Sequence, residues 1–275
     1  VFNDVYFSKK KGIGESHYVF IEGNNLIERF KSCPPEKTFY IGELGFGTGL
    51  NFILTFACFQ KYAPAHAKLH FISAEKYPFK KEDLQKALSL WPDLALETKI
   101  LLNAYPTLTP GMHTLYLTPR ITLTLMLGDA LSRYQSLLIC GSSTLEPMLR
   151  PMHIDAWYLD GFTPARNESL WDEQLLTVLA LLSKKGTTVA TFSAAKAVKI
   201  GLKKAGFNYE ITKGYGYKRD MLKGYFESYA QSIPKKMTPW AYSRPHMPLN
   251  REAIVIGAGL AGAYCAYRLA QNGYK

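Results

Sequence analysis

The sequence has few cysteines and no pattern that would pair them. They lie far apart along the chain, with no C-x-x-C pair and no histidine at zinc-ligand spacing; they are Cys33, Cys58, Cys140 and Cys265. This spacing favours neither a disulfide framework nor a structural metal site. It is typical of reduced thiols, so we expect a cytoplasmic protein without bound metal.

Long apolar runs are also missing from the 275 residues. No segment reaches the eighteen or so apolar residues that a membrane span requires, so we expect no membrane partner. The first residues, "VFNDVYFSKKKG", lack the apolar run of a signal peptide. The chain begins without Met, and we expect residues to be missing before it. Internal repeats and low-complexity tracts are absent as well.

Acidic residues are scarce in the last third of the chain. Residues 1–182 hold 17 Lys+Arg and 18 Asp+Glu, whereas residues 183–275 hold 16 and 4. The excess cations are Lys184, Lys185, Lys196, Lys199, Lys203, Lys204, Lys213, Lys218, Arg219, Lys223, Lys235 and Lys236. Such an excess of positive charge favours the binding of a polyanion such as nucleic acid, since each phosphate that is neutralised releases counterions. The alternative is a solvated helix face, which is the simpler interpretation for Lys203 and Lys204 alone.

Apolar runs typical of buried strands alternate with helical patterns along the chain. The expected strands are "TFYIGELG", "LHFISAE", "ITLTLMLGDA", "DAWYLDGF" and "TTVATFSA". The helical patterns "LNFILTFACFQKY" and "KEDLQKALSLW" follow the first two strands, and "SLWDEQLLTVLALLSKKG" and "KAVKIGLKKAG" follow the last two. Strand and helix in turn predict an α/β, Rossmann-like fold, with a mostly parallel sheet and helices on both faces. "SIPKKMTPWAYSRPHMP" holds four prolines and is the best linker candidate.

A first glycine loop follows the first strand, with Gly45, Gly47 and Gly49 in "GELGFGTGLNF". Glycine permits a tight turn and a close approach of a ligand to the backbone. Glu43, two residues before the first glycine, would repel a pyrophosphate at the following helix N-terminus. The same carboxylate suits a ligand that carries an ammonium group, such as S-adenosylmethionine.

Two further acids end strands at the same predicted edge of the sheet. Glu75 closes "HFISAE", where an acidic side chain can accept hydrogen bonds from both hydroxyls of a ribose, and Asp129 follows another strand in "LMLGDAL". Each acid alone could instead cap a helix or lie in a surface turn. Three acids at three strand ends, one beside a glycine loop, predict a pocket for S-adenosylmethionine.

"DAWYLDGFTPARNESLW" places another acid among aromatic residues. Asp160 follows Trp157 and Tyr158 and precedes Phe162, so we expect its carboxylate at a strand end in a partly dry setting. Such a setting makes a carboxylate a better proton acceptor near neutral pH. The alternative is an Asp that caps the helix carrying Trp171.

"KGYGYKRDML" mixes glycines and tyrosines with basic residues, including Lys218 and Arg219. A basic loop with interleaved aromatic residues suits phosphates and stacked bases. A plain hairpin turn is the alternative interpretation.

A second glycine loop, Gly257, Gly259 and Gly262, follows the apolar "AIVI", which we read as a short strand before a helix. Its G-x-G-x-x-G spacing is that of a dinucleotide-binding fold, which also needs an acid about twenty positions further on. The chain ends at Lys275 before any such acid. We therefore interpret residues 251–275 as the start of a dinucleotide domain and expect no flavin to bind them.

These motifs together resemble the MnmC family of bifunctional tRNA-modifying enzymes. The resemblance rests on "DVYFS", "YVFIEGNNL", "ELGFGTGLNF", "HFISAEKYP", "WYLDGFTPARN", "ATFSAA", "KGYGYKRDML" and "VIGAGLAGA". It implies a methyltransferase domain over residues 1–233, a linker over 234–250, and the first residues, 251–275, of an FAD-binding oxidoreductase domain. It also implies methyl transfer from S-adenosylmethionine to the aminomethyl nitrogen of nm5s2U in the tRNA anticodon stem-loop, giving mnm5s2U. FAD would serve the full-length family, which removes a carboxymethyl group.

The resemblance also implies roles for single residues. The cofactor set is Glu43, Gly45, Gly47, Gly49, Asn51, Glu75, Lys76, Asp129 and Ala130. The substrate set is Phe162, Pro164, Asn167, Lys218 and Arg219. As a hypothesis for catalysis, Asp160 orients the amine and helps to take its proton, while Glu15 and Tyr6 complete a polar wall. Two other functions remain open: an FAD or NAD oxidoreductase fragment, and an RNA-binding module without turnover.

Overall fold

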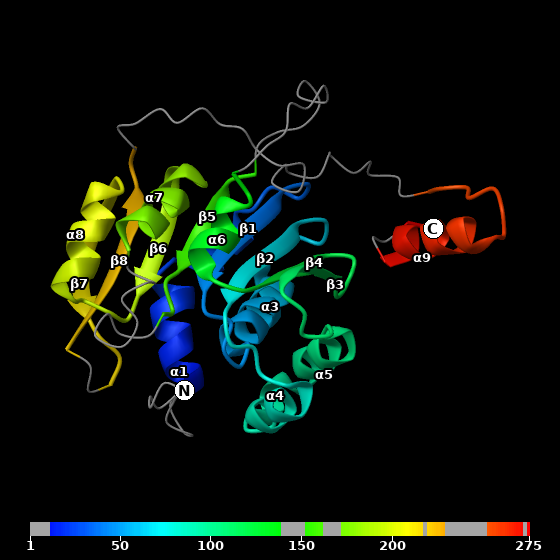
Figure 1. Ribbon diagram of the computed structural model, residues 1–275, viewed down its shortest axis with the longest axis horizontal. Coiled ribbons are helices and arrows are strands. Elements are labelled where there is room, and N and C mark those ends of the chain that lie inside the picture. Colours follow the sequence, from blue (N-terminus) through cyan, green and yellow to red (C-terminus); the bar gives the residue numbers. More distant parts are fainter. Residues whose placement is uncertain (1–11, 139–151, 162–171, 217–218, 229–251, 272–273) are drawn as a thin grey trace.

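The computed structural model describes residues 12–138, 152–161, 172–216, 219–228, 252–271 and 274–275 (Figure 1). Within them, eight strands form one sheet in the order β3-β4-β2-β1-β5-β6-β8-β7. The strands are β1 (Thr38–Leu44), β2 (Lys68–Glu75), β3 (Gly111–Tyr116), β4 (Ile121–Leu127), β5 (Ile154–Tyr158), β6 (Ser183–Thr191), β7 (Phe207–Lys213) and β8 (Asp220–Phe226).

The five central strands run parallel, which confirms the predicted class. β1 pairs in parallel with β2 on one side and with β5 on the other, β2 continues to β4, and β5 to β6. The edges are antiparallel, because β3 pairs with β4 and the hairpin β7–β8 pairs with β6 through β8. The sequence pattern did not predict these three outer strands.

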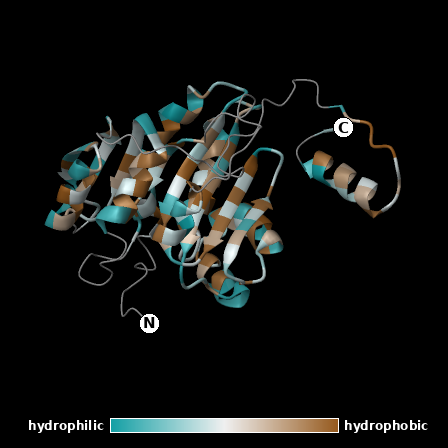
Figure 2. Ribbon diagram, turned by 45° about the horizontal axis from the view of Figure 1, so that its top comes forward, coloured by the Kyte–Doolittle hydropathy of each residue, from teal (hydrophilic) through white to brown (hydrophobic). Residues whose placement is uncertain are grey.

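Helices cover both faces of the sheet (Figures 1 and 2). One face carries α1 (Gly12–Ser16), the π-helical turn η1 (His17–Glu22), α2 (Leu26–Lys31), α3 (Leu50–Tyr62), α4 (Lys81–Leu88), the 3-10 turn η2 (Pro92–Leu94) and α5 (Ala95–Ala104). The other face carries α6 (Ala130–Gln135), α7 (Glu173–Leu181) and α8 (Lys196–Lys204). Each face encloses its own apolar cluster, as expected when a parallel sheet is buried between two helical layers.

β1 and α3 form the centre of this arrangement. All residues of β1 after Thr38 are buried, because parallel strands with both faces covered are apolar on both sides. A Cβ at Gly42 would lie 2.1 Å from the Trp157 ring, so the middle of β1 admits only glycine beside that indole. α3 then buries its apolar face along the sheet, which fixes the glycine loop between the two elements.

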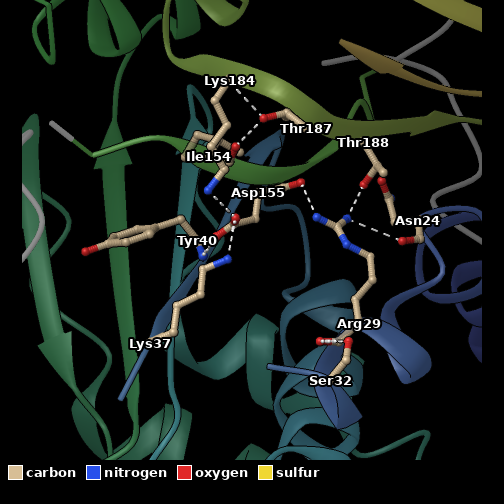
Figure 3. A network of polar contacts seen from close by, with 10 residues as sticks. All are labelled: Asn24, Arg29, Ser32, Lys37, Tyr40, Ile154, Asp155, Lys184, Thr187 and Thr188. Atoms are coloured by element: carbon tan, nitrogen blue, oxygen red, sulfur yellow. Dashed lines mark hydrogen bonds and ion pairs between the residues drawn. The ribbon is translucent and has the colours of Figure 1, made fainter. Parts of the chain in front are cut away.

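A polar network ties β1, β5 and β6 together at the amino end of the sheet (Figure 3). Asp155 accepts hydrogen bonds from the backbone N–H of Tyr40 at 2.9 Å and from Lys37 Nζ at 2.9 Å, and forms an ion pair with Lys184 at 2.8 Å. Burial opposes the charge of Asp155, but the two ammonium groups outweigh it and hold the pKa below its usual value. This network stabilises the edge of the sheet opposite to the one where the predicted acids lie.

The last described segment forms a helix but not the predicted strand. α9 (Leu260–Gln271) matches the helical pattern, whereas residues 252–258 form no strand. Ile254 and Ile256 are 93% and 95% exposed, and Figure 2 shows this hydrophobic stretch running outside the sheet. An apolar run becomes a strand only with a neighbouring strand to pair with, and none lies beside these residues in the described part of the chain.

Candidate active site

Four acids meet at the carboxyl edge of the parallel strands. Glu43 lies near the end of β1, Glu75 ends β2, Asp129 follows β4, and Asp160 follows β5. β1 has its sequence neighbour β2 on one side and the distant β5 on the other, so the strand order reverses beside it. Open α/β sheets bind their ligands at such a switch point. The structure thus brings the strand-end acids to one edge, while their binding roles stay predictions.

The first glycine loop crosses this edge between β1 and α3. Gly45, Gly47 and Gly49 have φ angles of 89°, 52° and 70°, in the left-handed region that favours glycine. The N–H of Gly45 donates to the carbonyl of Ala74 at 2.9 Å, and a Cβ there would lie 3.2 Å from the backbone oxygen of Asp160. The loop is thus folded tightly between the ends of β2 and β5.

Glu75 is held by the backbone of the glycine loop and of its own turn. Its Oε2 accepts from the N–H of Gly47 at 2.9 Å, and its Oε1 accepts from the N–H of Tyr77 at 2.7 Å. A carboxylate can accept about four hydrogen bonds, so about two remain possible for a ligand such as a ribose. The neighbouring Lys76 is exposed, with its ammonium 5.7 Å from the centre of the Tyr77 ring.

Glu43 is fully buried behind the loop. Its Oε2 accepts from the hydroxyl of Ser73 at 2.6 Å, and its Oε1 accepts from the amide of Asn51 at 3.0 Å. Burial raises the pKa of Glu43 to about 8, and the charges of Asp160 and Glu75 act in the same direction. The carboxyl group therefore holds a proton up to neutral pH, and its direct contact with a ligand ammonium stays a prediction.

Asp160 is half-buried and is bound to the first turn of α3. Its Oδ2 accepts from the amide of Asn51 at 2.6 Å, so one amide bridges the carboxylates that end β1 and β5. The alternative role, capping the next described helix, belongs to Asp172, whose side chain accepts from the N–H of Gln174 at 2.6 Å. The neighbouring residues Phe162, Pro164 and Asn167 lie outside the described residues, as does Tyr6.

Comparison with known proteins connects this geometry with a family. Residues 92–227 match the sequence profile of a family described as S-adenosyl-L-methionine-dependent methyltransferase. The whole chain is 49% identical to the "tRNA 5-methylaminomethyl-2-thiouridine biosynthesis bifunctional protein MnmC" of Legionella pneumophila strain Corby and covers 42% of it. Over its whole length, the chain is thus similar to part of a bifunctional MnmC protein.

A second MnmC protein, from Chromohalobacter salexigens, is 42% identical over 99% of the chain, which covers 37% of that protein. The chain thus spans about two fifths of the length of these relatives. A crystal structure of MNMC2 from Aquifex aeolicus has the same fold, with a TM-score of 0.60 and 22% identity over 83% of this chain and 66% of that one. The described residues form an S-adenosylmethionine-dependent methyltransferase fold, as the resemblance implied.

Asp129 both caps a helix and lies at the acidic edge of the sheet, which were the two interpretations drawn from the sequence. It is the N-cap of α6, since its Oδ1 accepts from the N–H of Ser132 at 3.3 Å, and it also lies at the acidic edge next to the buried Ala130. The preceding Gly128 N–H donates to the carbonyl of Glu75 at 2.8 Å, so the ends of β2 and β4 are held together. Its position at the carboxyl edge of the sheet is therefore set by both its cap and the sheet.

The helix α1 reaches the same edge through Ser16, a residue to which the sequence pattern assigned no role. The hydroxyl of Ser16, in α1, donates to the amide oxygen of Asn51, 35 positions further along the chain. Glu15 precedes this serine and is half-buried. Ser16, Asn51 and Ser73 belong to three different elements, so no local spacing relates them to Asp160.

The described residues of the basic segment "KGYGYKRDML" lie at the end of β7, at the start of β8 and between them, and the two strands pair as an antiparallel hairpin, which agrees with the alternative interpretation. The hairpin lies against η1 and α1: the hydroxyl of Tyr18, in η1, donates to the carbonyl of Lys213 at 2.9 Å, and a Cβ at Gly14, in α1, would lie 2.1 Å from the hydroxyl oxygen of Tyr215. Arg219 is exposed beside this turn, while Lys218 lies outside the described residues. The hairpin thus brings basic residues next to the helix that contacts Asn51.

Several cations of the last third have acidic partners. Ion pairs join Lys184 to Asp155, Lys185 to Glu227, Lys204 to Glu173 and Lys223 to Glu210. The last three of these pairs are exposed, and exposed pairs contribute little to stability, whereas Asp155 is buried. Lys213 and Arg219, at the hairpin turn, are exposed and are in no ion pair among the described residues.

The predicted absences concern only the described part of the chain. There, no group of three or more His, Cys, Asp or Glu side chains is placed to hold a metal ion. Among the described helices, none has both the length and the apolar character that crossing a membrane requires.

Proposed function

We propose that this chain methylates the aminomethyl nitrogen of nm5s2U at the wobble position of tRNA, giving mnm5s2U, with S-adenosylmethionine as the methyl donor. The observation that carries the proposal is the Asp160 carboxylate, bound to Asn51 at 2.6 Å beside a glycine loop at the switch point of the sheet. The name of the Legionella relative, which specifies 5-methylaminomethyl-2-thiouridine, supports the choice of substrate.

The residues at this edge fit S-adenosylmethionine better than a dinucleotide. Glycines with positive φ at 45, 47 and 49 leave the backbone open to close approach, and Glu75 retains acceptor capacity for ribose hydroxyls. A pyrophosphate would meet the carboxylates at three strand ends, whereas a cationic ligand without phosphate suits them. We assign Asp129 and Ala130 to the adenine side. When bound, S-adenosylmethionine supplies a methyl group on a positive sulfonium, whose C–S bond breaks with its electron pair left on sulfur.

Asp160 has the chemical role in this proposal. An alkylammonium with a pKa of about 10 is neutral in only about one molecule in a thousand at pH 7, and only the neutral amine has the lone pair that forms the new N–C bond. Asp160 orients the amine and accepts the proton that it releases. Glu15 and Tyr6 complete the polar wall, and much of the rate comes from holding the reacting atoms in line.

Basic residues of the last third bind the anticodon stem-loop in this proposal. The hairpin turn with Lys213 and Arg219 contacts α1 through Tyr215, and α1 contacts Asn51 through Ser16. A backbone bound at this hairpin would therefore lie next to the catalytic carboxylate. The proposal assigns Lys218 and the segment with Phe162, Pro164 and Asn167 to the same substrate surface.

The proposed organisation keeps residues 1–233 as the methyltransferase domain and 234–250 as a linker. Residues 251–275 begin an FAD-binding domain, which would remove the carboxymethyl group of cmnm5s2U in the full-length proteins. The reaction takes place in the cytoplasm, where buried thiols such as Cys33 and Cys58 stay reduced.

Transfer of a radiolabelled methyl group to undermodified tRNA tests the proposal. Label should appear in tRNA that carries nm5s2U and not in tRNA that carries cmnm5s2U, whose nitrogen is already substituted. S-adenosylhomocysteine at about 100 times its Kd should stabilise the protein by about 2.7 kcal/mol. Stabilisation without any transfer to tRNA would leave a methyltransferase fold acting on another substrate, and would contradict the proposed one.

A further inference from the structure

Asn51 connects three side chains at the centre of the site. Its Oδ1 accepts from the hydroxyl of Ser16, and its two amide hydrogens are donated to Glu43 Oε1 at 3.0 Å and to Asp160 Oδ2 at 2.6 Å. The three partners come from α1, β1 and the segment after β5, and Asn51 itself lies in the first turn of α3. With only 8% of its surface exposed, its amide has little access to water.

The partners determine how the amide is oriented. Two carboxyl oxygens face its nitrogen and a hydroxyl faces its oxygen, so the opposite orientation would set the amide oxygen against both acids. An amide is a neutral group with two donors and one acceptor, which is what these three partners require. Aspartate would add a third acid, and serine would supply a single donor.

The bond to Asp160 is not required to hold Glu43. Ser73 binds the other oxygen of Glu43 at 2.6 Å, and Tyr134 binds the Glu43 backbone at both its N–H and its carbonyl, at 3.0 and 2.7 Å. The Asp160 carboxylate lies after β5, and its Oδ2 accepts the second amide hydrogen of Asn51 at 2.6 Å. The second amide hydrogen therefore serves the orientation of Asp160.

We propose that Asn51 is a positioning residue for methyl transfer: its amide orients the Asp160 carboxylate toward the substrate amine and separates it from the carboxyl group of Glu43. This inference rests on the proposed function and deepens it. The amide lies between two acids that would otherwise face each other, and like charges that face each other raise the pKa values of the pair. The other ionisable groups in electrostatic contact with Glu43 are Glu75, Tyr134 and Tyr158.

The test compares Asn51→Asp and Asn51→Ala with a matched control on the same helix. Thr55→Val is isosteric and removes a hydroxyl one turn further along α3, which binds the Asn51 carbonyl at 2.7 Å and the Tyr158 hydroxyl at 2.9 Å. Both Asn51 variants should lower kcat for nm5s2U tRNA roughly 100-fold, the effect of about 1 Å of misplacement, with KM for tRNA unchanged. Thr55→Val should lose stability but keep the wild-type pH profile of kcat.

The second readout does not depend on activity. In the unliganded protein, Asn51→Asp sets a third acid beside Glu43 and Asp160, so its unfolding free energy should fall more steeply than that of the wild type between about pH 5 and pH 8. The unfolding free energy of Thr55→Val should change with pH as that of the wild type does. Unchanged kcat and pH profile in Asn51→Asp, or an unchanged stability slope, would overturn the inference. If wild-type protein transfers no methyl group to tRNA, the proposed function fails by itself, while the stability slopes still decide whether Asn51 separates the two acids.

Discussion

The chain contains two glycine loops whose local sequences resemble each other and whose surroundings differ. Gly45–Gly49 connects the central strand β1 to α3, and nine residues of that helix are buried. Gly257 and Gly259 precede α9 and Gly262 lies in its first turn; this helix has no buried residue, and the segment before it forms no strand. A helix thus begins at both glycine patterns, but only at the first do neighbouring strands bring other acids to the loop.

Replacement of Asp160, the acid beside the first loop, should have the largest effect on activity. Asp160→Ala should lower methyl transfer to nm5s2U tRNA by about 10² to 10⁴ fold, the usual contribution of a positioned proton acceptor. Affinity for S-adenosylhomocysteine, measured by calorimetry, should stay the same. Asp172→Ala is the matched control, because this Asp caps α7; it should lose about 1 kcal/mol of stability and keep its activity. Full activity of Asp160→Ala would remove Asp160 from the mechanism.

The buried acid before the first loop should make the protein sensitive to pH. The folded-state pKa of Glu43 is raised from 4.5 to about 8, so the folded protein binds a proton that the unfolded chain releases between these values. The contribution of Glu43 to stability should be fully present below pH 4.5 and be lost as pH rises toward 8, by at most about 1.4 kcal/mol per pH unit. Denaturant unfolding of Glu43→Gln should show a smaller decline over this range. Parallel curves for the two proteins would contradict the raised pKa.

Matched substitutions compare the two loops directly. Gly45 has a φ of 89° and lies against the Asp160 backbone, whereas Gly257 has a φ of 116° with no atom within 4 Å of an added Cβ. Alanine in a left-handed conformation costs about 1–2 kcal/mol, so Gly45→Ala should bind S-adenosylhomocysteine about tenfold more weakly. Gly257→Ala should bind it as the wild type does. Equal effects of the two substitutions would show that the loops do not differ in function.

The smallest expected effect concerns the basic hairpin next to the first loop. Lys213→Ala with Arg219→Ala should weaken tRNA binding and reduce the slope of log K against log salt by about one unit for each phosphate that the variant no longer neutralises. Lys86→Ala, on α4, is the control, since this exposed lysine forms only a 3.8 Å pair with Asp83 among the described residues. If the double variant and the control have the same salt slope, the hairpin does not contact the tRNA backbone.

Much of the central sheet could be predicted from the sequence. The apolar runs at β1, β2, β4, β5 and β6 are buried on both faces. Such a continuous apolar run in the sequence is what indicates a strand of a parallel sheet. The strands β7, β8 and β3 were not predicted, although a hairpin turn was the alternative between the first two, because partly exposed strands have only weak apolar patterns. "AIVI" had the apolar pattern without a partner strand, and there the prediction was wrong.

The features of the site also divide into those that the sequence could predict and those that it could not. The acids could be predicted because each lies at the end of an apolar strand, a feature of local sequence. The amide bridge of Asn51 and its contacts with Ser16 and Glu43 could not, because they join elements that only the folded sheet brings together. Nor does any local pattern indicate that Glu43 lies behind the loop with both carboxyl oxygens bonded.

Nucleoside analysis of tRNA after incubation with the chain tests the central claim most directly. The tRNA carries nm5s2U, S-adenosylmethionine is the only added cofactor, and no flavin is present. If the first glycine loop and Asp160 form the active site, nm5s2U should be converted to mnm5s2U. Unchanged nm5s2U, or conversion only when FAD is added, would contradict this account.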